Sequence, residues 1–191
     1  MYKQLLKGDY RKLAAKSNDA ATGGGARDLR FPFKEFNGIF AELLPNARTE
    51  FRRRDGVRSA VNLRTGPVFI DLIDTDTGHQ TTETAEMIWE SPTDARGSEG
   101  RIAKVHASPA TSQLLAARDD DLGEVFLLLV QDDDGELRVH YAYEKELRAG
   151  DWAGAVSDPV LKHLDGDRRQ DRAVVGYIDF VTNFAYAHGA R

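Results

Sequence analysis

Cysteine is absent from this 191-residue chain. Disulfide bonds, thiolate chemistry and cysteine-ligated zinc are therefore excluded. Long apolar runs are absent as well, since no stretch approaches the roughly 18 residues that a membrane-spanning helix requires. The amino-terminal residues MYKQLLKGDYRKL lack the uninterrupted apolar segment of a secretory signal. We expect a cytoplasmic protein that has no membrane partner.

The sequence also lacks the motifs of common enzymes. None of its lysines follows an acidic residue by two positions, the spacing with which many restriction nucleases hold magnesium. The five histidines show no HxH or HExxH spacing, and there is no G-x-S-x-G or Walker motif. The acidic clusters at 119–121 and 132–134 are interpreted as solvated turns rather than cation sites. We therefore predict no catalytic residue, no metal and no cofactor.

The net charge of −5 is divided unevenly along the chain. Residues 1–64 hold 14 Lys and Arg against 7 Asp and Glu, whereas residues 65–191 hold 12 against 24. Such asymmetry is typical of a protein with one surface that meets a polyanion. The alternative is that the opposite charges pair with one another across the fold.

The pattern of apolar residues predicts a mainly β chain with helices, an α+β fold. A strand is expected at 29–33, stopping at Pro32, and a helix from Lys34 to its end at Pro45. Further strands are expected at 49–54, 57–63, 68–73, 124–131 and 137–144. Six or more short strands with a few helices indicate a small barrel or pseudobarrel.

Turn and loop signals separate these elements. Asp55-Gly56 and Gly66-Pro67 predict hairpin connections, residues 74–84 an exposed turn or strand edge, and residues 90–101 an irregular stretch.

Towards the carboxyl terminus, residues 147–164 and 176–188 are expected to be helical. The second helix would bury Ile178, Val181, Phe184 and Ala185. We place one domain at 1–165 and a helical extension or linker at 166–191.

Two polar segments carry side chains suited to DNA. The first arm comprises Lys16, Ser17, Asn18, Asp19, Thr22, Gly23, Gly24, Gly25, Arg27 and Arg30. The second arm comprises Arg96, Ser98, Glu99, Arg101 and Lys104. Arginine can bridge guanine O6 and N7, Asn can bridge adenine, and carboxylates can accept from cytosine N4. Consecutive glycines let the backbone approach a ligand closely, although they also suit a plain connection.

The stretch SNDAATGGGARDLRFPFKEFNGIFAELLP resembles the first recognition arm, strand and helix of the amino-terminal effector and DNA-recognition domain of the EcoRII restriction enzymes. SEGRIAK at 98–104 is similar to the second arm of that domain. The resemblance implies a B3-like pseudobarrel whose two arms clamp the major groove of double-stranded DNA. It also implies a role in restriction or phage defence, with a nuclease domain or subunit as partner.

Carried over by position, the resemblance assigns base reading to Glu99 and Arg101 and a basic contact to Lys104. Three positions depart from the family: Gly100 replaces a lysine, Gly25 a histidine and Arg30 a tyrosine. We therefore expect a target sequence different from that of the family.

Two other functions stay open. One is a divergent metal-dependent nuclease that uses, for instance, Asp71 and Glu83. The other is a protein- or small-ligand-binding domain in which the glycine-rich arm is a simple connection and DNA does not bind.

Overall fold

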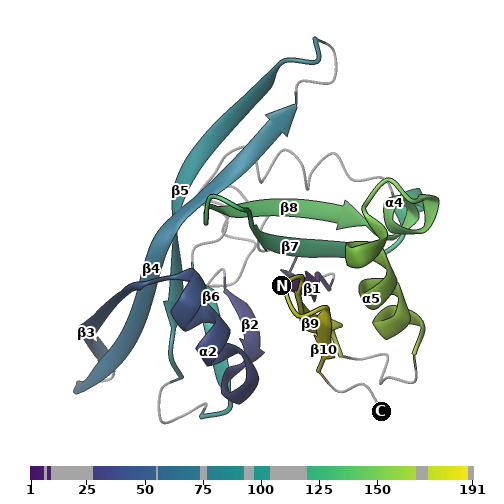
Figure 1. Cartoon of the computed structure of the whole chain (residues 1–191). Coiled ribbons are helices and arrows are strands. Elements are labelled where there is room, and N and C mark those ends of the chain that lie inside the picture. The colour runs from purple at the N-terminus through teal and green to yellow at the C-terminus, as the bar shows by residue number, and fades with distance from the viewer. Residues whose placement is uncertain are drawn as a thin grey trace.

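In the computed structural model, the chain forms a mixed β-sheet on which helices pack (Figure 1). The structure describes residues 1–6, 8–9, 28–54, 56–73, 77–92, 97–103, 120–166 and 172–188. The expectation of a mainly β chain with helices is confirmed. The strands are β1 (Tyr2–Gln4), β2 (Leu29–Pro32), β3 (Asn46–Arg54), β4 (Val57–Ile73), β5 (Gln80–Glu90), β6 (Glu99–Ala103), β7 (Val125–Gln131), β8 (Leu137–Tyr143), β9 (Val175–Asp179) and β10 (Phe184–Ala187). The helices are α2 (Phe33–Leu43), α4 (Glu144–Ala149), α5 (Gly154–Asp165) and the 3-10 turn η4 (Asp120–Leu122).

The strands follow one another in the order β10-β9-β1-β7-β8-β4-β5-β6-β2, and β3 pairs with β4 outside this path. All pairs are antiparallel except β4 with β8, which meet in parallel where Phe69 lies opposite Arg138. Figure 1 shows two ribbons that extend from the body, one formed by β3 and β4 and the other by the distal parts of β4 and β5.

The main core joins the two halves of the sheet. It combines Leu127 and Val139 of the β7–β8 hairpin with Trp89 of β5 and with Phe36 and Phe40 of α2. A second cluster lies on the other side of the β7–β8 hairpin, where α4 and α5 cover it. Strand alternation explains this arrangement, because successive residues of β7 point to opposite faces and both faces are buried. One face of β7 therefore packs in the core that contains α2, and the other face packs against α4 and α5.

Several sequence predictions for single elements are confirmed. β2 ends at Pro32 and α2 follows at once, burying Phe36 and Phe40. β7 and β8 form the expected hairpin. β3 and β4 join through a tight turn in which Gly56 has φ +81°, a conformation that favours glycine.

Gly66-Pro67 is not a turn, which corrects the predicted hairpin connection. β4 continues through both residues, and they pair with Met87 and Glu86 of β5. Gly66 is buried, and a side chain there would press on Leu44, which follows α2. The glycine serves close packing rather than a reversal of the chain. Residues 74–84 were predicted to be an exposed turn or strand edge, and the part from Gln80 onwards is the exposed start of β5, where it pairs with β4 alone.

The carboxyl-terminal helix predicted at 176–188 is wrong. These residues form the β9–β10 hairpin, which joins the sheet through β1. Asp179 accepts hydrogen bonds from the Val181 and Thr182 amides, and Asn183 has φ 54°. These turn features override the helix-like spacing of apolar residues. Val181, predicted to be buried, is 96% exposed.

The predicted helical stretch 147–164 divides into α4 and α5. The break follows from Gly150, which caps α4 in the left-handed conformation. No helix in the described part of the chain is long and apolar enough to cross a membrane.

Candidate nucleic-acid interface

Four of the residues predicted to bind DNA lie in the described part of the chain: Arg30, Ser98, Glu99 and Arg101. The others lie outside the described residues: Lys16, Ser17, Asn18, Asp19, Thr22, Gly23, Gly24, Gly25, Arg27, Arg96 and Lys104. Arg30 is on β2, and both Glu99 and Arg101 are on β6. The end of the predicted irregular stretch at 90–101 is therefore a strand.

The structure brings one residue of each predicted arm into contact. β2 pairs with β6 so that Arg30 lies opposite Arg101 and Pro32 opposite Glu99. Arg30 Nη1 donates to Glu99 Oε2 at 2.9 Å, and the two side chains are 40% and 46% exposed. The two arms thus contribute to a single solvent-facing surface of the β2–β6 pair.

The parts of the two arms that precede these strands join them at opposite ends of the pair. The chain passes from the first arm into β2 at Leu29, opposite Ile102, and from the second arm into β6 at Glu99, opposite Pro32. At about 3.3 Å per strand residue, the two junctions are about 10 Å apart. The Ser98 carbonyl accepts the Phe33 amide at 2.9 Å, which fixes the second junction to the start of α2.

Arg101 is held by two buried carboxylates. Its Nε donates to Glu90 Oε2 at 2.6 Å and its Nη1 to Asp28 Oδ2 at 2.6 Å. Its Nη2 also contacts Glu90. Arg52 Nη2 reaches the other Glu90 oxygen at 2.7 Å. If Arg101 contacted a base, Asp28 and Glu90 would lose this guanidinium partner. The geometry therefore indicates that Arg101 mainly stabilises the fold.

The protonation of Glu90 reflects the same network. Burial of its side chain, which is only 4% exposed, opposes ionisation. Hydrogen bonds from Arg52 and Arg101 outweigh this effect, so the pKa of Glu90 lies below its ordinary value. Glu90 is therefore a charged group at neutral pH, kept so by two guanidinium groups.

Gly100 has a packing reason that the sequence did not reveal. A Cβ at this position would collide with the Trp89 indole on the neighbouring strand. A longer side chain such as lysine would have no room here beside Trp89. The glycine at position 100 is thus explained by its close approach to a buried tryptophan.

The two acids considered for a nuclease do not converge. Asp71 lies opposite Thr82, whereas Glu83 lies opposite Ile70, so the two carboxylates point to opposite faces of the β4–β5 ribbon. Asp71 also accepts hydrogen bonds from Thr82 and Arg138. In the part of the chain that the structure describes, no group of three or more His, Asp and Glu side chains could hold a metal ion.

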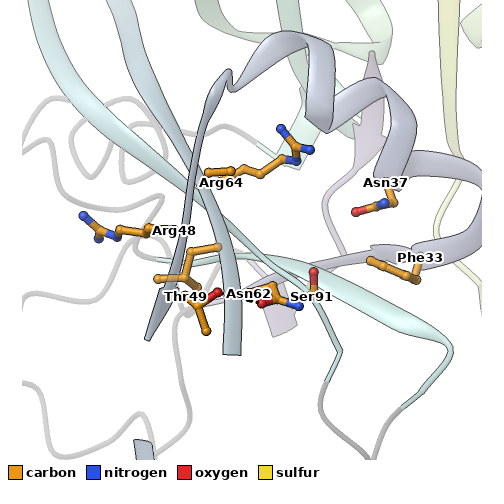
Figure 2. A pocket seen from close by; sticks show the side chains of 9 residues that line it. Phe33, Asn37, Arg48, Thr49, Asn62, Arg64 and Ser91 are labelled. Atoms are coloured by element: carbon orange, nitrogen blue, oxygen red, sulfur yellow. Dashed lines mark hydrogen bonds between the residues drawn. The ribbon is translucent and has the colours of Figure 1, made fainter. Parts of the chain in front are cut away.

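A pocket of about 550 Å³ lies between α2 and the β3–β4 ribbon. It is lined by Phe33, Asn37, Ala47, Arg48, Thr49, Asn62, Leu63, Arg64 and Ser91. Figure 2 shows Thr49, Asn62 and Ser91 close together, with Asn37 and Phe33 across the pocket and the Arg48 guanidinium directed away. Arg64 lines the pocket on the same face of the ribbon as Asn62, and no acidic residue lines it, which suits an anionic ligand.

Sequence reasoning missed the β3–β4 ribbon as a functional candidate. This segment carries six arginines between 48 and 64 against the acids Glu50 and Asp55. The charge count of the first 64 residues contained this signal.

Comparison of the whole chain with protein-family models, curated proteins and solved structures finds no match in any of the three. The fold and the site by themselves define a mainly β domain built on an open mixed sheet, with arginine-rich strands at one end.

Proposed function

We propose that this chain is a sequence-specific, double-stranded DNA-binding domain of the B3-like pseudobarrel type. Its two arms read bases in the major groove, and its biological role is in restriction or phage defence. The observation that carries the proposal is the Arg30–Glu99 contact, which joins the two predicted arms on one exposed surface. A core shared by both halves of the sheet is consistent with a pseudobarrel.

The chemistry of this pair suits base reading. Arginine can donate to guanine O6 and N7, while Glu can accept from the N4 amine of cytosine. An exposed ion pair contributes only about 0–1 kcal/mol to stability. Arg30 and Glu99 can therefore separate and bind base edges instead, at a small loss of stability. Arg101 cannot do so as easily, because its carboxylate partners are buried.

The test is selection of bound duplexes from a randomised pool. We expect one enriched sequence, and we expect Arg30→Ala and Glu99→Gln to relax it at one or two positions. Each lost base contact removes about 1–3 kcal/mol of discrimination. Arg148→Ala is the matched control, since Arg148 of α4 is similarly exposed and forms ion pairs with Glu144 and Asp165.

Two outcomes would contradict the proposal. A lack of any duplex affinity at low salt would favour a protein- or ligand-binding domain. Magnesium-dependent cleavage of plasmid DNA that is lost in Asp71→Asn would favour the nuclease.

A further inference from the structure

The two faces of the β3–β4 ribbon carry their arginines differently. On one face, Arg48 and Arg52 each form an ion pair with Glu50, and Arg52 also binds Glu90. On the other face lie Arg53, Arg58 and Arg64. None of these three arginines forms an ion pair with a described residue. Among the described side chains, the arginines of the first face are thus paired with carboxylates, whereas those of the second face keep their positive charge.

We call the second surface the arginine face. Strand register places these residues on it: Ala47, Thr49, Phe51, Arg53, Arg58, Ala60, Asn62 and Arg64. The set contains three cations and no carboxylate.

At the tip of the ribbon, Arg53 and Arg58 lie directly opposite each other. Like charges in this position destabilise a strand pair. The Arg58 guanidinium lies 4.3 Å from the ring centroid of Phe51, which is 62% exposed. A bound anion would relieve the repulsion between the two arginines. An exposed aromatic ring beside a guanidinium is also typical of nucleic-acid-binding surfaces.

At its base, the arginine face runs into the pocket of Figure 2. The amide oxygens of Asn37 and Asn62 already accept hydrogen bonds, from Trp89 Nε1 and Thr49 Oγ1. The two amides therefore offer a ligand chiefly their N–H groups. With Arg64, these donors suit a group that only accepts hydrogen bonds, such as a phosphate.

The pocket also adjoins the predicted second arm. Ser91, where the chain leaves β5 towards that arm, lines the pocket, and its amide donates to the Asn62 carbonyl at 2.9 Å. A duplex held by the second arm would lie next to the arginine face.

We propose that the arginine face binds the phosphodiester backbone of the DNA, with Arg53 and Arg58 on successive phosphates and the Asn62–Arg64 pocket holding another. This inference rests on the proposed DNA-binding function and adds a contact surface separate from Arg30 and Glu99. Such contacts position the duplex and carry no sequence information.

The experiment compares duplex affinity across a salt series for the unaltered protein and for the double variant Arg53→Ala/Arg58→Ala. Each neutralised phosphate adds about 0.9 to the slope of log affinity against log salt. The double variant should reduce this slope by nearly two and weaken selected and random duplexes equally, by about tenfold or more at low salt. Lys145→Ala/Lys162→Ala, which removes two exposed charges from α4 and α5, should change neither.

A second variant tests the pocket. Asn62→Asp keeps an acceptor for Thr49 but adds a carboxylate beside Arg64. It should weaken all duplexes alike without shifting the urea unfolding midpoint. Tight binding with an unchanged salt slope in both variants would overturn the inference and leave the proposed function standing. Failure of the unaltered protein to bind any duplex would overturn both.

Discussion

Arg101 holds two carboxylates that have almost no access to water, so its removal should destabilise the fold. In Arg101→Ala, Asp28 loses its guanidinium partner and Glu90 keeps only Arg52. Breaking a fully buried pair costs about 3–5 kcal/mol. Because Arg101 is partly exposed, we expect a loss of about 2–3 kcal/mol in the free energy of unfolding, measured with urea.

Glu99→Gln is the control for this prediction. It breaks the solvent-exposed bond to Arg30 and should cost less than about 1 kcal/mol. Equal stability losses in Arg101→Ala and Glu99→Gln would show that the Asp28–Arg101–Glu90 network contributes nothing beyond a surface ion pair.

Gly100→Ala should also destabilise the protein, by overpacking. The added methyl would collide with the Trp89 indole, which is fully buried. Inserting a methyl group into a packed core costs about 1–3 kcal/mol. Gly97→Ala is the matched control, since nothing lies near a side chain at that position. An unchanged unfolding midpoint in Gly100→Ala would mean that Trp89 moves aside freely.

For these single residues, the sequence identified Arg101 and Glu99 as polar residues of one arm but could not separate their roles. The difference comes from partners that are distant in the sequence. Asp28 is brought to Arg101 by β2–β6 pairing, and Glu90 by β5–β6 pairing. Such pairings depend on strand register, which local residue types do not determine.

Among the elements, the β9–β10 hairpin yields a direct test because a helix was expected there. Val181 lies in its turn and is almost fully exposed. Val181→Ser should therefore change the free energy of unfolding by less than about 0.5 kcal/mol. In a helix that buried Val181, the same change would cost several times more. Urea unfolding distinguishes the two structures.

The elements that the sequence predicted well are those whose local signals agree. The β7–β8 hairpin combines an apolar run, a turn at Gly135 and alternating residues in β8, and all of these indicate the same structure. The signals at Gly66-Pro67 and at 176–188 were ambiguous. Glycine serves both turns and close packing, and apolar residues at spacings of three to four can fall on a hairpin and its turn. Tertiary contacts with Leu44 and β1 decided these cases.

For the whole molecule, the titratable groups predict lower stability in acid. Burial lowers the pKa of His140, an effect that Asp71 opposes and Arg138 reinforces. The unfolded chain therefore takes up the His140 proton at a higher pH than the folded protein does. Stability falls as the pH drops through the ordinary histidine value of about 6.5, by at most about 1.4 kcal/mol per pH unit for one proton.

A second loss follows at lower pH from Glu90, whose folded pKa lies below its ordinary value because hydrogen bonds from Arg52 and Arg101 outweigh its burial. The stabilisation is present above the ordinary carboxyl pKa and disappears as the pH falls through the lower, folded value. His140 and Glu90 thus act in the same direction but in separate pH ranges. Unfolding free energies measured from about pH 8 to about pH 2, a range that covers the ordinary histidine and carboxyl pKa values and extends below them, should decline in two stages.

His140→Asn separates the two stages. Asparagine does not titrate in this range, so the decline near neutral pH should become shallower while the decline below about pH 4.5 stays. His79→Asn is the control, since His79 is exposed in the turn before β5. An identical pH profile in His140→Asn and the unaltered protein would mean that His140 gains its proton equally easily in both states. Burial of His140 beside Trp152 would then not disfavour the charged form of the imidazole.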